Sequence, residues 1–250
     1  MRFTFHDTPI TVNMPRHAAL ETEVARRFRH GDGFALATVN LDHLVKMTES
    51  PAFTRVYAAQ DLVVADGWPV VALSHLARQP VELMPGSDLV LPLCRLAADA
   101  GAGVALVGST GATLDNAATA LRDKVPGLEI VLTLSPPMGF DPESAEADAI
   151  FARLNDSGAR LCLLALGAPK QETMAARGRH AAPGIGFASI GAGLDFLGGQ
   201  QKRAPRLMRR AGLEWLWRAL SSPRRLGPRY ARCIAILPGR VADALRQRRG

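Results

Sequence analysis

Five short stretches of this sequence place polar side chains directly after apolar runs of strand length, where α/β proteins commonly bind ligands. They are Thr38-Val39-Asn40, Ala65-Asp66-Gly67, Gly108-Ser109-Thr110-Gly111, Gly167 to Glu172, and Gly191 to Asp195. The carboxyl ends of parallel strands meet at one edge of a sheet, so these polar residues are expected to lie at that edge. The pattern predicts a ligand site built from the turns that follow the strands.

Asp66 is the candidate for acid–base chemistry. It lies between a predicted strand and a predicted helix that contains Pro69 near its start. The positive N-terminal end of a helix favours an ionised carboxylate, and a carboxylate held at a strand end is suited to act as a general base for a sugar hydroxyl. Taken alone, Asp-Gly at such a position is more often a plain turn or a helix N-cap. Both interpretations stay open from these residues.

The turn from Gly108 to Gly111 has backbone amides suited to hold a phosphate or to hydrogen-bond a nucleotide. An ordinary tight turn is an equally good interpretation. The segment fits neither G-x-G-x-x-G nor the P-loop pattern, which disfavours a dinucleotide enzyme or an NTPase.

The turn from Gly167 to Glu172 holds more polar side chains than a strand-to-helix connection needs. Gln171 is suited to bind a hydroxyl or amide of a sugar or base, and Lys170 a phosphate. The alternative is a plain first helical turn with Glu172 near the helix dipole.

The C-terminal fifth of the chain is strongly basic. Residues 201–250 contain 14 Lys and Arg against Glu214 and Asp243, a formal charge of +12, so the whole-chain charge of +7 leaves −5 for residues 1–200. Such asymmetry indicates an anionic partner or surface. Two helical apolar stripes lie among these arginines, namely Leu213, Leu216, Trp217 and Leu220, then Tyr230, Ile234 and Leu237. Helices docked on the body, a nucleic-acid patch and a membrane-interface surface all fit, and Trp with Leu between flanking arginines favours the membrane.

Strand and helix patterns alternate through the first 197 residues. A hairpin is predicted within residues 3–12, followed by a helix over Arg16–Arg29. Predicted strands then cover Phe34–Val39, Leu62–Ala65, Gly103–Val107, Glu129–Thr133, Arg160–Leu166 and Gly184–Ile190. Predicted helices cover Leu41–Thr48, Trp68–Arg78, the segment from an N-cap at Ser87 to about Ala100, the segment ending at Lys124, and Pro142–Asn155. This order predicts a Rossmann-like α/β fold with a mainly parallel sheet and helices on both faces. Residues 1–197 are predicted to form the body and 198–250 a basic helical appendage.

The composition limits the classes of protein to which this chain can belong. With 250 residues and 48% hydrophobic side chains the chain can bury a core. The N-terminus does not resemble a signal peptide, and no run approaches the roughly 20 apolar residues of a membrane span, so we expect a cytoplasmic protein. Cys94, Cys162 and Cys233 are predicted to be buried reduced thiols. The six His are scattered, and no metal site is expected.

The order of these motifs resembles the WecG/TagA/CpsF glycosyltransferase family, glycosyltransferase family 26, over roughly residues 35 to 230. Besides Thr38 to Asn40, Ala65 to Gly67, Gly167 to Glu172 and Gly191 to Asp195, the resemblance rests on Glu82, Gly86-Ser87-Asp88-Leu89, Arg203-Ala204-Pro205, Gly212 to Trp215, Arg218, Pro223-Arg224-Arg225 and Arg229-Tyr230.

The resemblance implies an inverting, metal-independent hexosyltransferase without a cofactor. It would move a sugar from a UDP-sugar to a polyprenyl-diphosphate-linked saccharide at the cytoplasmic face of the plasma membrane, in bacterial cell-envelope or exopolysaccharide biosynthesis. Asp66 is implied as the base, with Thr38, Asn40 and Gln171 around the reacting sugars. Further substrate-binding candidates are Gly108, Ser109, Gly111, Lys170, Asp195, Arg203, Arg218, Arg224, Arg225 and Arg229. The absence of an Asp-x-Asp pair fits metal independence, because arginines would then neutralise the departing UDP.

The implied partners are the UDP-sugar, the lipid-linked acceptor and an anionic membrane, and no nucleic acid is expected. Self-association through the apolar stripes is a further expectation. The alternative hypothesis is a non-enzymatic module whose basic end binds nucleic acid. The family uses UDP-glucose, UDP-N-acetylmannosamine and its uronic acid, and these residues do not select among them. One departure stands out. Family members commonly have Glu-Arg before the Gly-Ser-Asp segment, whereas this chain has Glu82-Leu83, which puts donor choice or activity in question.

Overall fold

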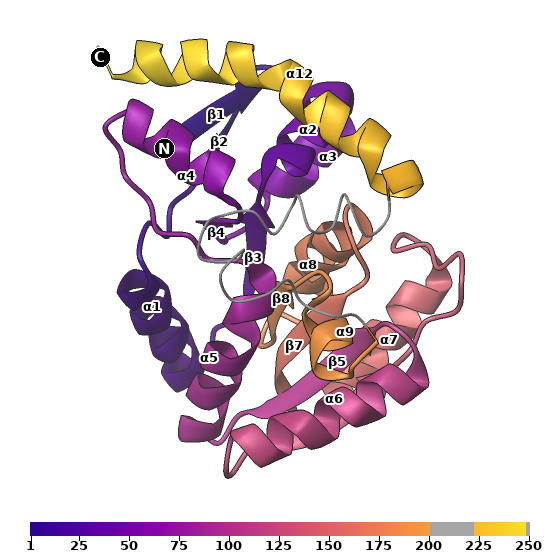
Figure 1. Ribbon diagram of the computed structural model, residues 1–250. Coiled ribbons are helices and arrows are strands. Elements are labelled where there is room, and N and C mark those ends of the chain that lie inside the picture. The colour runs from indigo at the N-terminus through magenta and orange to yellow at the C-terminus, as the bar shows by residue number, and fades with distance from the viewer. Residues whose placement is uncertain (201–222, 249–250) are drawn as a thin grey trace.

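The computed structural model describes residues 1–200 and 223–248, and of residues 223–226 it describes the backbone alone. Six parallel strands form the central sheet in the order β4-β3-β8-β7-β5-β6 (Figure 1). The strands are β3 (Phe34–Val39), β4 (Leu62–Ala65), β5 (Gly103–Gly108), β6 (Ile130–Leu134), β7 (Ala159–Ala165) and β8 (Gly186–Ser189). The predicted Rossmann-like parallel sheet is confirmed.

Helices cover both faces of this sheet, because its strands are buried on both sides and alternate residues point to opposite faces. Leu36 belongs to the apolar cluster on one face and Ala37 to the cluster on the other. The first face carries α1 (His17–His30), α5 (Gly86–Asp99), α6 (Gly111–Lys124) and α9 (Gly193–Leu197). The second carries α2 (Leu41–Glu49), α3 (Pro51–Ala58), α4 (Trp68–Leu76), α7 (Ala145–Asp156) and α8 (Lys170–Ala181).

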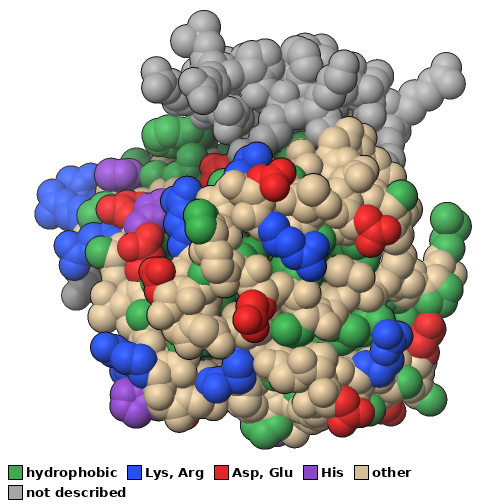
Figure 2. Space-filling model, turned by 90° about the horizontal axis from the view of Figure 1, so that it is seen from below, with side chains coloured by type: hydrophobic (Ala, Val, Ile, Leu, Met, Phe, Trp, Pro, Cys, Tyr) green, Lys and Arg blue, Asp and Glu red, His purple; other side chains and the backbone are tan. Residues whose placement is uncertain are grey.

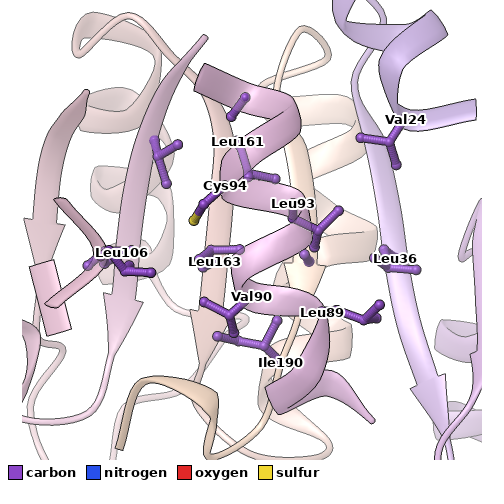
Figure 3. Packing of buried hydrophobic residues seen from close by; sticks show 14 of the residues in the cluster. Val24, Leu36, Leu89, Val90, Leu93, Cys94, Leu106, Leu161, Leu163 and Ile190 are labelled. Carbon is purple, nitrogen blue, oxygen red and sulfur yellow. The ribbon is translucent and has the colours of Figure 1, made fainter. Parts of the chain in front are cut away.

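Helix α5 shows how the first face is packed. Its Leu89 and Leu93, four residues apart, lie on the side that meets the strands, where Leu36 and Leu163 project toward them (Figure 3). All four side chains are at most 1% exposed. Burying a leucine contributes roughly 1.5–3 kcal/mol, so this helix is held in place mainly by its apolar face.

The predicted N-terminal hairpin is confirmed as β1 (Arg2–Phe5) and β2 (Thr8–Thr11), an antiparallel pair. A long helix at the other end of the chain, α12 (Pro223–Gln247), crosses α2 and α4 and reaches β1 (Figure 1). The N-terminal hairpin and α12 therefore both lie on the second face.

Helix α12 confirms that the second apolar stripe, Tyr230, Ile234 and Leu237, lies on a helix, but the buried side of that helix differs from the predicted one. Cys233 and Ala244 are buried, whereas Ile234 of the predicted stripe is 60% exposed. The first predicted stripe, Leu213 to Leu220, lies outside the described residues. The division of the chain at residue 197 stays a prediction.

Several elements differ from the sequence-based prediction, and helices α3, α5 and α7 are examples. Helix α3 was not expected, although Ser50 caps it and Pro51 opens it. Helix α5 begins at Gly86 rather than after a Ser87 cap, where the glycine lies close to the backbone of Ile190. Helix α7 begins at Ala145 rather than Pro142. No helix in residues 1–200 or 223–248 combines the length and apolar character that crossing a bilayer needs.

Candidate active site

Asp66 lies directly after β4, at the carboxyl edge of the sheet. Its backbone N–H donates to the Val39 carbonyl oxygen over 2.8 Å, which fixes it against the end of β3. Gly67 follows with φ +102°, a conformation that favours glycine, and α4 begins at the next residue. The Asp66 carboxylate is therefore held beside the N-terminus of α4 and is partly exposed.

Asn40 is brought against Asp66 by the pairing of β3 with β4. Its side-chain Nδ2 donates to Asp66 Oδ2 over 3.1 Å. Asn40 is also the N-cap of α2 and forms a capping box. Its side-chain Oδ1 accepts from the backbone N–H of His43, and its backbone N–H donates to His43 Nδ1, both over 3.2 Å. These bonds orient the side-chain amide of Asn40 so that its NH2 group faces the Asp66 carboxylate.

Thr38 lies one residue before the end of β3 and is 4% exposed. Its carbonyl oxygen accepts a hydrogen bond of 2.7 Å from the hydroxyl of buried Tyr57, on α3. The structure thus brings Thr38, Asn40 and Asp66 together on adjacent strands, as the sequence predicts.

Gln171 lies at the start of α8, after β7, and is 3% exposed. Its Oε1 accepts from the Gly191 amide over 3.1 Å, and its Nε2 donates to Glu172 Oε1 over 2.8 Å. Both ends of the amide are therefore bonded within the protein, and Gln171 joins the turns after β7 and β8. Lys170, beside it, is partly exposed at the first position of α8.

The turn after β5 meets the turn after β8. Ser109 Oγ donates to Asp195 Oδ1 over 2.6 Å. Gly108 has φ +124°, and a Cβ there would stand 2.3 Å from the Ala165 carbonyl oxygen, so this glycine allows β5 and β7 to approach. Thr110 caps α6, which begins at Gly111. The structure brings Ser109 and Asp195 into contact, with Gly108 and Gly111 in the same turn as Ser109. In the sheet, β5 before this turn is separated from β4 before Asp66 by β3, β8 and β7.

His43 and Glu172 form a buried layer behind the site that the sequence analysis did not identify. Burial lowers the pKa of His43 to about 3 and raises the pKa of Glu172 to about 7. A histidine three residues after a predicted Asn cap is the signal that could have revealed the capping box. The contact between His43 and Glu172 depends on tertiary packing and has no signal of its own in the sequence.

Among the C-terminal arginines, the structure places Arg229 near the site. Its Nε lies 2.9 Å from Oδ1 of Asp42, in the first turn of α2, although the N–H is not directed at that oxygen, so the contact is an ion pair rather than a hydrogen bond. Asp42 also pairs with Lys46. Arg203 and Arg218 lie outside the described residues, as do the side chains of Arg224 and Arg225.

Leu83, where the resembled family commonly has arginine, lies beside Asp66. It forms a parallel bridge with Ala65, and the Met84 amide donates to the Ala65 carbonyl oxygen over 2.7 Å. The departure from the family pattern is therefore local to the candidate base.

Burial suppresses the reactivity of the cysteine thiols. The three cysteines are free and buried, and burial raises the pKa of Cys94 to about 12, which keeps that thiol protonated. In the described part of the chain, no group of three or more His, Cys, Asp or Glu is placed to hold a metal ion.

The family model of the WecG/TagA/CpsF glycosyl transferases matches residues 5–250 of this sequence. The match extends beyond the stretch that carries the motifs, since it includes most of the hairpin and all of α12. The matched region thus contains both the polar residues at the carboxyl edge of the sheet and the basic helix α12. This chain belongs to the WecG/TagA/CpsF family of glycosyl transferases.

Proposed function

We propose that this glycosyl transferase moves a hexose, an N-acetylmannosamine or its uronic acid from a UDP-sugar to a saccharide on a polyprenyl diphosphate, with inversion, in the assembly of a bacterial surface or exocellular polysaccharide. The observation that carries the proposal is the Asp66–Asn40 pair at the carboxyl edge of the sheet in a chain of this family. A carboxylate oriented by an amide is suited to remove a hydroxyl proton.

The proposed reaction is a single displacement. Asp66 accepts the proton of the acceptor hydroxyl while that oxygen forms a bond to the anomeric carbon of the donor. The bond from the anomeric carbon to the UDP oxygen breaks, and UDP leaves with the electron pair. One base and one displacement give inversion, and the Asn40 hydrogen bond keeps the carboxylate aimed in one direction.

The donor would lie across the turns after β3, β7, β5 and β8. The Asp195 carboxylate bonded to Ser109 repels phosphate and accepts hydrogen bonds, so this cluster suits the ribose hydroxyls or the uracil N–H. The diphosphate would then lie near Lys170 and the C-terminal arginines. These cations would stabilise the negative charge of the leaving group without a metal ion.

Helix α12 supports association with an anionic membrane. Residues 223–248 contain seven arginines and one acidic residue, Asp243. Ile234 and Leu245 on this helix are 60% and 40% exposed. By contrast, basic and acidic side chains are interspersed on the visible described surface in Figure 2. A basic helix with exposed apolar residues is typical of the membrane interface.

The first test is a screen of UDP-sugars against a lipid-diphosphate-linked acceptor, followed by Asp66→Asn with the active donor. We expect release of UDP to fall by roughly 10²-fold or more, because the proton acceptor is lost. Asp115→Asn, on the exposed side of α6, is the matched control and should keep its turnover. An Asp66→Asn protein with near-normal turnover would refute the assigned role. Tight binding to nucleic acid without any response to UDP would instead favour a binding protein.

The second test measures binding to vesicles that contain an anionic phospholipid. Ile234→Ser with Leu245→Ser should weaken binding several-fold without unfolding the protein, since both side chains are exposed and neither belongs to a buried core cluster. Val131→Ser removes a similarly exposed side chain from the edge strand β6 and should leave binding unchanged. Equal binding by all these proteins would exclude α12 from the membrane contact.

A further inference from the structure

A buried polar pair, His43 and Glu172, lies directly behind Asn40 and Gln171 of the candidate site. His43, on α2, is 5% exposed, and Glu172, on α8, is fully buried. Neither residue belongs to the proposed reaction. Charged or titratable groups are rarely fully buried without a structural or functional reason, because taking them from water costs free energy.

The contacts of this pair join the ends of four strands. On one side His43 Nδ1 accepts from the amide of Asn40, whose side chain bonds Asp66. On the other side Glu172 Oε1 accepts from Gln171 Nε2, whose Oε1 bonds the turn after β8. Between them, His43 Nε2 lies 3.8 Å from Glu172 Oε1, a polar contact longer than a hydrogen bond.

We propose that His43 and Glu172 act together as positioning residues that fix Asn40 and Gln171 relative to each other and thereby aim the Asp66 carboxylate. The inference rests on the proposed function, because it assigns the pair a role in the same reaction. Neither residue touches the substrate in this proposal. His43 acts through the backbone N–H of Asn40, and Glu172 acts through the side-chain amide of Gln171.

The hydrogen-bonding pattern favours a neutral form of both side chains. The backbone N–H of Asn40 can only donate, so His43 Nδ1 is the acceptor of that bond and Nε2 carries the imidazole proton toward Glu172. The Tyr57 hydroxyl donates to the Thr38 carbonyl oxygen. Glu172 Oε2 has no hydrogen-bond partner among the described residues. An ionised carboxylate with an unpaired buried oxygen is costly, and protonation removes that cost.

This neutral form would be lost as the pH rises through the Glu172 pKa of about 7, which burial raises. The titratable groups that face Glu172 are His43, Lys46 and Asp42 from α2 and Tyr57 from α3. Asp42 carries the neighbouring ion pairs with Lys46 and Arg229. A charge on Glu172 would leave its buried Oε2 charged and unpaired, so the side chain should move from this arrangement and positioning should weaken at alkaline pH.

The experiment compares Glu172→Gln, Glu172→Ala and the control Thr173→Ala in the full-length chain. Gln keeps the acceptor oxygen and stays neutral, whereas Ala removes it. Thr173 is the next residue of α8, and its Oγ1 bonds only the Pro169 carbonyl oxygen within the described residues. Steady-state kcat and KM for the donor are measured by release of UDP from pH 6 to 8.5.

We expect Glu172→Ala to lower kcat about tenfold or more with a change in KM below about threefold, as misplaced catalytic groups do. At pH 6.5 Glu172→Gln should stay within about threefold of wild type, and its kcat relative to wild type should rise toward pH 8.5. Thr173→Ala should match wild type. A folded Glu172→Ala protein within twofold of wild-type kcat overturns the proposal, as does a Glu172→Gln protein with no change in relative kcat across this pH range. If the Ala variant does not fold, the pH dependence of the Gln variant decides.

A second readout does not depend on turnover. In ¹⁵N-labelled wild-type protein the side-chain amide resonances of Asn40 and Gln171 should shift with a midpoint near pH 7, and in Glu172→Gln that transition should be absent. Resonances that behave identically in both proteins overturn the positioning role. A wild-type protein that shows this transition but releases no UDP from any donor refutes the proposed function alone.

Discussion

Replacing Glu172 by glutamine should make the protein more stable at alkaline pH while leaving its stability near pH 5 almost unchanged. Burial raises the Glu172 pKa from 4.5 to about 7. At about 1.4 kcal/mol per pKa unit, this corresponds to about 3 kcal/mol. Because the pKa is raised on folding, the folded state binds more protons than the unfolded state between these two pH values. Stability therefore falls as the pH rises from 4.5 to 7 and stays at the lower level above that range.

His43 acts in the opposite direction over part of the same range. Its pKa is lowered from 6.5 to about 3 by burial, so its contribution to stability is present above pH 6.5 and is lost as the pH falls. The two effects partly cancel in the wild-type protein between pH 4.5 and 6.5. The difference between wild type and Glu172→Gln isolates the carboxyl group, provided that His43 titrates alike in both.

The assay is urea unfolding of both proteins at pH 5 and pH 8. We expect similar free energies of unfolding at pH 5 and a variant more stable by about 3 kcal/mol at pH 8. The side chain is completely buried, so solvent screening does not reduce this figure. An advantage at pH 8 that exceeds that at pH 5 by less than about 1 kcal/mol would show that Glu172 is not strongly perturbed, and a less stable variant at pH 8 would refute the reasoning outright.

Three further predictions concern stability. His43→Asn keeps an acceptor for the capping box but has no group that is protonated between pH 6.5 and 3. The midpoint of its acid unfolding should therefore move to lower pH in a circular-dichroism titration, and an unchanged midpoint would contradict the lowered pKa of His43. A double-mutant cycle with Arg229→Ala and Asp42→Asn should give a coupling of about 1 kcal/mol in urea unfolding, kept small by the exposure of the arginine, and no coupling would remove the ion pair from the contacts that hold α12. Gly108→Ala should cost about 3 kcal/mol or more, whereas Gly111→Ala, where a Cβ meets nothing within 4 Å, should be nearly neutral; equal melting temperatures would refute the close approach of β5 to β7.

Much of the fold follows from local patterns in the sequence. The runs Phe34–Val39 and Leu62–Ala65 are buried strands because every side chain in them is apolar or small enough to lie between two helical layers. The order of the strands could not be derived in this way, because nothing in the run Gly186–Ser189 indicates that it lies between β3 and β7. Helix α3 was missed although Ser50-Pro51 carries a start signal, because its eight residues are too short to show a helical period.

The candidate site was predictable to the extent that it follows from a parallel sheet. Asp66 and Asn40 meet because the ends of adjacent parallel strands are neighbours, and this needs no side-chain detail. The orientation of Gln171 could not be derived, because it depends on Gly191 and Glu172, which only the folded chain brings to the two ends of its amide. Sequence patterns thus identify the edge on which chemistry occurs more readily than the direction in which each group points.

The docking of α12 changes how the role of the basic C-terminal segment should be tested. Arg229 pairs with Asp42 in the first turn of α2, and the N-cap of the same helix is Asn40, the partner of Asp66. Ala244 of α12 belongs to the apolar cluster on the second face of the sheet. Deleting everything after residue 197 would therefore remove the proposed membrane contact, uncover part of the core and leave Asp42, next to the candidate site, with Lys46 as its remaining ion-pair partner among the described residues. Substitutions on the exposed side of α12 change the first of these alone, so they separate the proposed binding to the membrane from support of the candidate base Asp66.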